Sequence, residues 1–224
     1  MTEPNTTETV NEARKFIAVE GPIGVGKTSL ARRLAKAFQA ELLLEEAEEN
    51  PFLERFYQNP KSAALPTQLF FLFQRARELQ KARQPDLFSP LRIADFLMEK
   101  DRLFARMNLD DDELRLYEQV YAQMAVDAPR PDLVIYLQAP VDVLMGRIRK
   151  RGRPEEDTIE RAYLQKVVDD YAHFFHYYDD APLLIVNASG VDLVENDEDF
   201  QELLSRIETT VKGRHYFNPK SVHV

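Results

Sequence analysis

The sequence predicts an α/β fold in which helices flank a central parallel sheet of five strands. Short apolar runs alternate with stretches of helical spacing, and a glycine-rich loop joins the first run to the first helix. The predicted strands are Phe16–Val19, Glu41–Leu44, Leu91–Ala94, Leu133–Leu137 and Leu183–Val186. The predicted helices span about 28–40, 66–84, 97–126, 141–150, 158–178 and 197–211. In sheets of this kind, ligands bind at the carboxyl ends of the strands.

The length of 224 residues suits a single domain with one continuous core, which we assign to residues 15–212. Residues 1–14 are polar and lack the apolar segment of a signal peptide, so they are predicted to be a disordered tail. Residues 213–224 show little pattern and are predicted to be a loosely attached C-terminal tail. No apolar run approaches the roughly 18 residues that span a bilayer, so the sequence predicts no membrane partner and a cytoplasmic location.

Composition narrows the class of function. The formal net charge of −9 argues against a nucleic acid polymer as partner, because proteins that bind DNA or RNA usually carry excess positive charge. The chain has no Cys, which excludes disulfides, thiol chemistry and thiolate metal sites. These properties fit an enzyme or module that acts on small molecules.

The glycine-rich loop reads Gly-Pro-Ile-Gly-Val-Gly-Lys-Thr over residues 21–28, between a strand and a helix. This arrangement binds the phosphates of a nucleoside triphosphate, because backbone N–H groups and the helix N-terminus converge on them. Lys27 is expected to reach the β- and γ-phosphates, and the Thr28 hydroxyl to reach Mg²⁺. The predicted nucleotide-binding residues are Gly21, Ile23, Gly24, Val25, Gly26, Lys27, Thr28 and Ser29. The D-x-x-G and N-K-x-D motifs of GTPases are absent from the sequence.

Acidic residues follow the second and third predicted strands. Asp95 is placed either to reach Mg²⁺ beside the glycine loop or to cap the next helix. Glu45 and Glu46 end the second strand, where a carboxylate could orient an attacking hydroxyl toward the γ-phosphate. The acids of residues 45–49 could equally form a solvated loop.

A third cluster is basic. Arg147 and Arg151 share a helical face, and Gly152 and Pro154 then end the helix, with Arg153 between them. We interpret this segment as an arginine-rich lid that closes over the triphosphate and stabilises transition-state charge. The alternative is a basic helix C-terminus that complements the helix dipole.

Taken in order, these segments resemble the deoxynucleoside kinase family, and most closely its bacterial deoxyguanosine and deoxyadenosine kinase branch. The resemblance covers about Phe16 to Ile207. It rests on residues 20–28, Glu49-Asn50-Pro51-Phe52-Leu53, Gln68 with Arg75, residues 132–137 and residues 151–156. It implies a P-loop kinase fold with an arginine-rich lid, ATP as phosphoryl donor and Mg²⁺ as cofactor. It also implies a homodimer through the helices near 66–84 and 97–126.

The resemblance implies roles for single residues. Glu45 would be the base for the sugar 5′-hydroxyl, and Tyr57 and Glu156 would contact the 3′-hydroxyl. The nucleobase edge would be read by Gln68, Arg75 and Asp101. The lid arginines would be Arg147, Arg151 and Arg153, which complete the catalytic set with Lys27 and Glu45. The adenine of ATP would lie near residues 187–193.

Two positions depart from the family pattern. An arginine commonly follows the acid after the third strand, whereas this chain has Asp95-Phe96-Leu97, and either Lys100 or Arg102 could supply the missing charge. Glu46-Ala47 stands where Pro-Val is common, which leaves the choice between Glu45 and Glu46 open.

Three residues of the predicted base site limit the substrate. Arg75 only donates hydrogen bonds, ionised Asp101 only accepts them, and the Gln68 amide does both. Thymine has no exocyclic amine and would leave Asp101 badly paired, at a cost of about 1–3 kcal/mol. We therefore expect purine deoxynucleosides first, deoxycytidine next and thymidine last.

The predicted reaction is phosphorylation of a deoxynucleoside 5′-hydroxyl by ATP in nucleotide salvage. A nucleoside monophosphate kinase of the thymidylate kinase type is one alternative, since it shares the loop and the lid. An NTP-binding regulatory module without a small acceptor is the other.

Some candidate residues also have a purely structural interpretation. Gln68, Phe71 and Arg75 lie on one helical stripe that could also be core. His173 and His176 show no metal-binding spacing.

Overall fold

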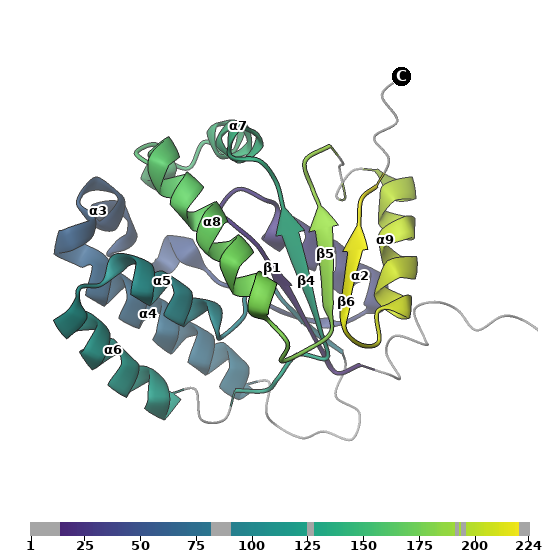
Figure 1. Ribbon diagram of the computed structural model, residues 1–224, viewed down its shortest axis with the longest axis horizontal. Coiled ribbons are helices and arrows are strands. Elements are labelled where there is room, and N and C mark those ends of the chain that lie inside the picture. The colour runs from purple at the N-terminus through teal and green to yellow at the C-terminus, as the bar shows by residue number, and fades with distance from the viewer. Residues whose placement is uncertain (1–13, 82–90, 125–127, 191–192, 194–195, 220–224) are drawn as a thin grey trace, which may run out of the picture.

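The computed structural model describes residues 14–81, 91–124, 128–190, 193 and 196–219. Its centre is a parallel sheet with the strand order β2-β3-β1-β4-β5-β6 (Figure 1). The strands are β1 (Phe16–Glu20), β2 (Glu41–Leu43), β3 (Arg92–Ala94), β4 (Leu133–Gln138), β5 (Leu183–Asn187) and β6 (Arg214–Phe217). The predicted α/β class and parallel sheet are confirmed, and the predicted number of five strands is wrong.

The sixth strand lies in the segment that the sequence assigns to a loose tail. β6 pairs with β5 from Leu183↔Arg214 to Val186↔Phe217, and Phe217 is only 2% exposed. As an edge strand it buries one of its four residues, so its sequence lacks the apolar signal of a central strand. At the other end, Arg14 is buried and its guanidinium donates to the Thr210 carbonyl at 2.7 Å, so the ordered domain begins before residue 15. Residues 1–13 and 220–224 of the predicted tails lie outside the described residues.

Helices connect the strands. They are α2 (Lys27–Phe38), α3 (Leu53–Gln58), α4 (Pro60–Lys81), α5 (Lys100–Asn108), α6 (Asp111–Met124), α7 (Val141–Arg151), α8 (Arg161–Tyr177) and α9 (Asp197–Thr209). Short 3₁₀ turns follow at η1 (Ala47–Glu49) and η2 (Pro154–Glu156). None of the helices in the described part of the chain is long and apolar enough to cross a membrane.

Two predicted helices differ from the observed ones. The predicted helix 97–126 is two helices, because the Asp110 carboxylate accepts hydrogen bonds from the backbone N–H groups of Asp112 and Glu113 and starts α6 afresh. The predicted helix 66–84 begins earlier, at Pro60, and contains Pro66 within it. Residues 82–84 and 125–126 of these predictions fall outside the described part of the chain.

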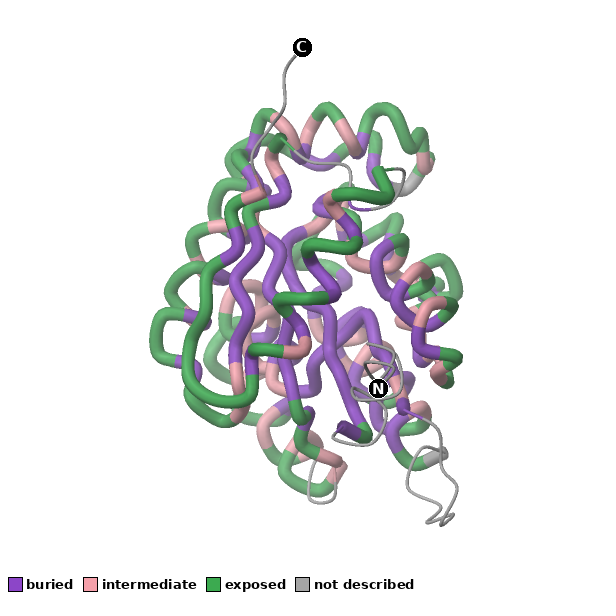
Figure 2. Tube along the Cα trace, turned by 90° about the vertical axis from the view of Figure 1, so that its right-hand side faces the viewer, coloured by how far each residue is buried: buried purple, intermediate pink, exposed green. Residues whose placement is uncertain are grey.

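The sheet is buried on both faces, as the strands at the centre of Figure 2 show. Side chains alternate along each strand, so Ile17 and Val19 of β1 face one core while Phe16 and Ala18 face the other. The first core is closed by α2, α7 and α9, and the second by α4, α5, α6 and α8. Figure 1 shows α8 lying across one face of the sheet.

This topology brings the ends of three strands together. β2, β3 and β1 are neighbours and run in the same direction, so the residues after them lie side by side at the carboxyl edge. The glycine loop follows β1, Glu45 follows β2, and Asp95 directly follows β3. The fold thereby gathers the phosphate loop and two carboxylates from distant parts of the sequence.

Candidate active site

The glycine loop ends at the N-terminus of α2, and its glycines are required by the geometry. Gly24 has a φ of 82°, and a Cβ atom there would lie 2.8 Å from Ile148 Cγ1. Gly21 has a φ of 148°, and a Cβ would lie 2.5 Å from the Leu137 carbonyl oxygen. Lys27 Nζ donates to the Gly21 and Pro22 carbonyls at 2.8 and 3.3 Å, so the ammonium group lies across the loop.

Asp95 joins the loop to the second strand. The Thr28 hydroxyl donates to Asp95 Oδ2 at 2.5 Å, and the Glu45 backbone N–H donates to Asp95 Oδ1 at 2.7 Å. Burial raises the pKa of the Asp95 carboxyl, and the hydrogen bond from Thr28 opposes that shift. Asp95 does not cap a helix, because α5 begins only at Lys100 and Glu99 precedes it.

Oxygen atoms of Thr28 and Asp95 suit Mg²⁺, which binds proteins through one or two carboxylates together with substrate phosphates. Among the described residues, no group of three or more His, Cys, Asp or Glu side chains could hold a metal unaided. The donor set therefore fits a metal that arrives with a nucleotide.

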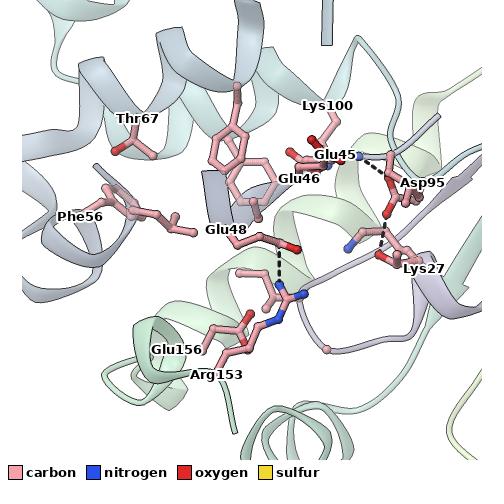
Figure 3. Close-up of a pocket in the computed structure, with 18 of the residues that line it drawn as sticks. Lys27, Glu45, Glu46, Glu48, Phe56, Thr67, Asp95, Lys100, Arg153 and Glu156 are labelled. Carbon is pink, nitrogen blue, oxygen red and sulfur yellow. Dashed lines mark hydrogen bonds and ion pairs between the residues drawn. The ribbon is translucent and has the colours of Figure 1, made fainter. Parts of the chain in front are cut away.

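A cavity lies beyond the loop, between α4, η1 and the lid turn η2 (Figure 3). The predicted site residues that line it are Ile23, Gly24, Lys27, Thr28, Glu45, Tyr57, Gln68, Arg75, Asp95, Arg151, Arg153 and Glu156. Aromatic side chains from several elements close its floor and sides, namely Phe56, Phe71, Phe104, Tyr163 and Tyr171. The cavity thus brings the phosphate-binding groups of the loop together with aromatic and polar side chains of the helices.

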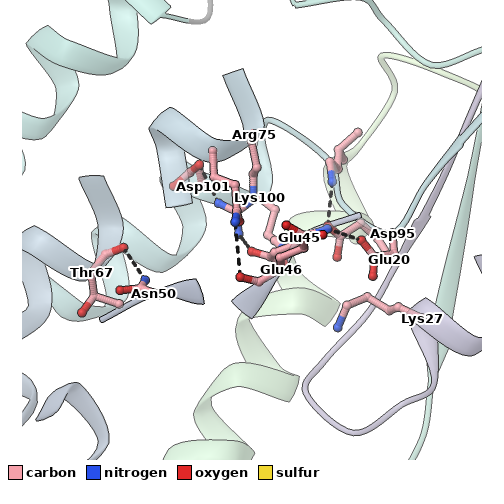
Figure 4. Close-up of polar contacts among 12 residues, drawn as sticks. Glu20, Lys27, Glu45, Glu46, Asn50, Thr67, Arg75, Asp95, Lys100 and Asp101 are labelled. Atoms are coloured by element: carbon pink, nitrogen blue, oxygen red, sulfur yellow. Dashed lines mark hydrogen bonds and ion pairs between the residues drawn. The ribbon is translucent and has the colours of Figure 1, made fainter. Parts of the chain in front are cut away.

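Glu45 lies between two cations in this cavity. One oxygen contacts the Arg75 guanidinium, and the other accepts a hydrogen bond from Lys100 Nζ at 2.8 Å (Figure 4). Although burial alone would raise it, the pKa of Glu45 is lowered to about 2 by Arg75 and then by Lys100. Glu46 is exposed, and its pKa is raised by a hydrogen bond with Glu49. Both glutamates line the cavity, and of the two candidates Glu45 is the one held as an anion between two cations.

The predicted base-reading residues are buried on α4 and α5. Gln68 and Arg75 are each 3% exposed and line the cavity. Asp101 is fully buried and does not line it; its carboxylate lies behind Arg75, with Oδ2 2.5 Å from Arg75 Nη1. Of the three predicted residues, Asp101 thus meets the cavity only through Arg75.

Tyr57 and Glu156 lie on the lid side of the cavity. The Glu156 carboxylate accepts from Arg151 Nε at 3.1 Å and from Arg151 Nη2 at 2.5 Å. Burial raises the pKa of Tyr57 well above its usual value, with further contributions from Tyr163 and Glu156. Arg153 lies 3.4 Å from Glu48 on η1, so the lid contacts the acidic segment across the cavity (Figure 3).

Arg147 lies elsewhere. Its guanidinium donates to the Val25 carbonyl at 3.2 Å and to the Ala188 carbonyl at 2.7 Å. It lines a second cavity with Val25, Gly26 and Ser29 of the loop and helix start, beside residues 188–190 after β5. The assignment of Arg147 to the lid with Arg151 and Arg153 stays a prediction. Arg147 lies a helical turn before Arg151 on α7 and reaches the outer side of the glycine loop.

The sequence does not identify Glu20 and leaves Lys100 as one of two candidates for the missing charge; both side chains are buried behind Glu45. Glu20, at the end of β1, accepts from the Leu97 backbone N–H at 2.8 Å and from the Tyr171 hydroxyl at 2.9 Å. Lys100 contacts Glu45, whereas Arg102 points away and pairs with Glu118 at 2.9 Å. The only early signal for Glu20 is an acidic residue at the end of an otherwise apolar strand.

Fold and site together define a nucleotide-binding phosphotransferase: a P-loop at the edge of a parallel sheet faces a pocket with an anionic Glu at their junction. The family model for deoxynucleoside kinase matches residues 17–212, and the chain belongs to this family.

Named relatives agree with this assignment. The chain is 35% identical to a deoxyguanosine kinase of Bacillus subtilis, over 88% of this chain and 97% of the relative. It is 28% identical to a deoxyadenosine kinase of Lactobacillus acidophilus, over 88% and 97% of the two chains. A solved deoxyadenosine kinase from M. mycoides, with products dCMP and dCDP bound, is similar with a TM-score of 0.73 and 28% identity, over 85% of this chain and 99% of that one.

Proposed function

We propose that this protein transfers the γ-phosphoryl group of ATP to the 5′-hydroxyl of a purine deoxynucleoside, as a step of nucleotide salvage. The observation that carries the proposal is the position of Glu45. Its carboxylate lies beside the glycine loop, in a cavity that Tyr57, Gln68 and Arg75 also line. Side chains of α3, α4 and the lid turn η2 all contribute to this cavity. The named relatives phosphorylate deoxyguanosine or deoxyadenosine, which supports the purine preference.

Glu45 orients the acceptor. Its carboxylate accepts the 5′-hydroxyl hydrogen bond and takes the proton as the bond between O5′ and the γ-phosphorus forms. The bond between that phosphorus and the bridging oxygen breaks, and ADP leaves. Because such transfers are largely dissociative, the orientation of the acceptor hydroxyl matters more than the basicity of Glu45. This suits a carboxylate with a pKa of about 2.

Mg²⁺ would be held by the Thr28 hydroxyl and the Asp95 carboxylate. The ion would neutralise charge on the β- and γ-phosphates when bound. Asp95 also accepts the Glu45 backbone N–H at 2.7 Å, so the residue proposed to hold the metal fixes the start of the segment that carries Glu45.

The lid arginines stabilise the transferring group. Arg151 and Arg153 line the same cavity as Lys27, and both are paired with carboxylates, Glu156 and Glu48 respectively. When the lid closes over a nucleotide, both arginines would bind phosphate oxygens in place of these carboxylates. We assign Arg147 to the adenine side of ATP, because it holds the Ala188 carbonyl against the glycine loop.

Gln68 and Arg75 supply the base contacts. Both side chains line the cavity, and the Nε atom of Arg75 is buried and makes no hydrogen bond within the described structure. Arg donors match the O6 and N7 acceptors of guanine, and an amide matches the N7 and N6 groups of adenine. Asp101 acts on the base through Arg75, which weakens the direct argument against thymidine and leaves the purine order in place.

An ATP-coupled assay across the four deoxynucleosides tests the proposal, with dGMP and dTMP as further acceptors. We expect deoxyguanosine or deoxyadenosine to give the highest kcat/KM. A monophosphate kinase would instead turn over dGMP or dTMP, and a regulatory module would hydrolyse ATP at a rate that no acceptor changes.

Homodimer formation and a cytoplasmic location belong to the same proposal. A groove between α5, α6 and α8 is lined by the half-buried apolar side chains of Leu103, Met107, Tyr121 and Phe174, together with charges of both signs. Multi-angle light scattering at micromolar concentration would give about twice the monomer mass of 26.0 kDa if this face pairs two copies.

A further inference from the structure

The inference starts from the missing arginine after β3. Phe96, which stands in that position, is fully buried in the second core and carries no charge. Lys100, at the first turn of α5, is 4% exposed and lines the cavity. Its ammonium group lies 2.8 Å from Glu45 Oε2 and 3.4 Å from Glu20 Oε1 (Figure 4).

Four side chains form a ring of alternating charge around this point. Lys100 contacts Glu45, Glu45 contacts Arg75, and Arg75 contacts Asp101. Lys100 and Asp101 are consecutive residues, so the backbone of α5 closes the ring. The same helical turn thereby holds both the proposed reacting carboxylate and the proposed base-reading guanidinium.

Glu20 fixes the lysine from behind. Its carboxylate accepts hydrogen bonds from the backbone N–H groups of Gly21 and Leu97 and from the Tyr171 hydroxyl, at 2.9, 2.8 and 2.9 Å. A carboxylate anchored by β1, α8 and the β3–α5 loop cannot follow Lys100 if the lysine moves. The ammonium group is therefore set in place before any substrate binds.

We propose that Lys100 is a positioning residue that replaces the absent arginine and holds the Glu45 carboxylate toward the acceptor hydroxyl. This inference rests on the proposed function. Arg75 must serve the base as well as Glu45, whereas the ion pairs of the Lys100 ammonium group within the described residues are with Glu45 and Glu20. Lys100 thus keeps Glu45 aimed while Arg75 engages a nucleobase.

The charges around Glu45 make the effect measurable. The side chains that face it are Arg75 of α4, Lys100 and Asp101 of α5, Lys27 of the loop, Glu20 of β1 and Asp95 after β3. Loss of Lys100 would leave four carboxylates facing two cations. Removing its ammonium group also removes the hydrogen bond to Glu45 Oε2, so that oxygen loses the contact that fixes its direction.

The test compares Lys100→Met with Lys100→Arg, and uses Lys36→Met, an exposed lysine of α2, as the matched control. We expect Lys100→Met to lower kcat for deoxyguanosine about ten- to hundredfold, with the KM for ATP within about threefold of wild type. Lys100→Arg keeps the charge and is more active than Lys100→Met.

A cycle with Glu45→Gln separates positioning from a general loss of structure. If Lys100 acts through Glu45, adding Lys100→Met to Glu45→Gln lowers kcat by less than about threefold further. Multiplicative losses, or a Lys100→Met variant with wild-type kcat, would overturn the inference. Should Lys100→Met not fold, the kcat of the double variant is compared with that of Glu45→Gln alone, because the double variant lacks both members of the ion pair. Wild-type enzyme without deoxynucleoside kinase activity would instead overturn the proposed function, and the inference with it.

Discussion

Replacing Glu45 with Gln tests the proposed chemistry most sharply among single substitutions. The amide has nearly the same shape but cannot take a proton from the acceptor, and it presents an NH₂ group to Arg75 or Lys100. We expect kcat to fall by about 10²–10⁴ while the KM for ATP changes little, because Lys27 and the glycine loop hold the triphosphate independently.

The assay is steady-state turnover of deoxyguanosine with ATP, and Glu46→Gln is the matched control. Glu46 is exposed and makes no contact with either cation in the described structure, so its variant should stay within about threefold of wild type. A nearly normal Glu45→Gln together with an inactive Glu46→Gln would show that the catalytic carboxylate is the next residue along the chain.

The same substitution has a stability signature. The pKa of Glu45 falls from 4.5 to about 2 on folding, which corresponds to about 3 kcal/mol of stability at neutral pH. Because the folded pKa is the lower one, this contribution is fully present above pH 4.5 and is lost as the pH falls toward 2. Urea unfolding should therefore show the wild type losing its advantage over Glu45→Gln between about pH 5 and pH 2. A stability difference that stays constant with pH would contradict the depressed pKa.

Three further predictions follow from single contacts. Arg151→Met should lower kcat at least about tenfold more than Arg149→Met, an exposed neighbour on α7, and equal effects would exclude a lid role for Arg151. Phe217→Ala should lower the free energy of unfolding by about 3–5 kcal/mol, whereas Tyr216→Ala, 65% exposed, should cost under about 0.5 kcal/mol; similar small losses would mean that β6 is not part of the core. Asp95→Asn should raise the Mg²⁺ concentration needed for half-maximal activity about tenfold or more, and an unchanged requirement would remove Asp95 from the metal site.

Much of the fold could be predicted because its signals are local. Runs such as Leu133–Leu137 are apolar throughout, which is typical of strands covered on both faces. β6 could not be predicted in this way, since an edge strand reading Arg-His-Tyr-Phe buries only Phe217. The break at Asp110 was equally hidden, because its capping hydrogen bonds depend on the backbone conformation that it induces.

The site residues likewise divide into those that could be placed from the sequence and those that could not. The glycine loop and the residues directly after β2 and β3 could be placed from sequence, because parallel topology fixes where strand ends meet. The positions of Arg147, Lys100 and Asp101 depend on how helices pack against one another, so spacing alone could not separate Lys100 from Arg102. The buried Glu20 network became visible only with β1, α5 and α8 in place.

The most direct test of the central claim is to determine which oxygen of the nucleoside is phosphorylated. With wild-type enzyme, ATP and deoxyguanosine, ³¹P NMR of the product should show a 5′-monophosphate, and 2′,5′-dideoxyguanosine should yield no phosphorylated product. A phosphate on the 3′-oxygen, or ADP formed at the same rate with both nucleosides, would contradict an acceptor hydroxyl held by Glu45.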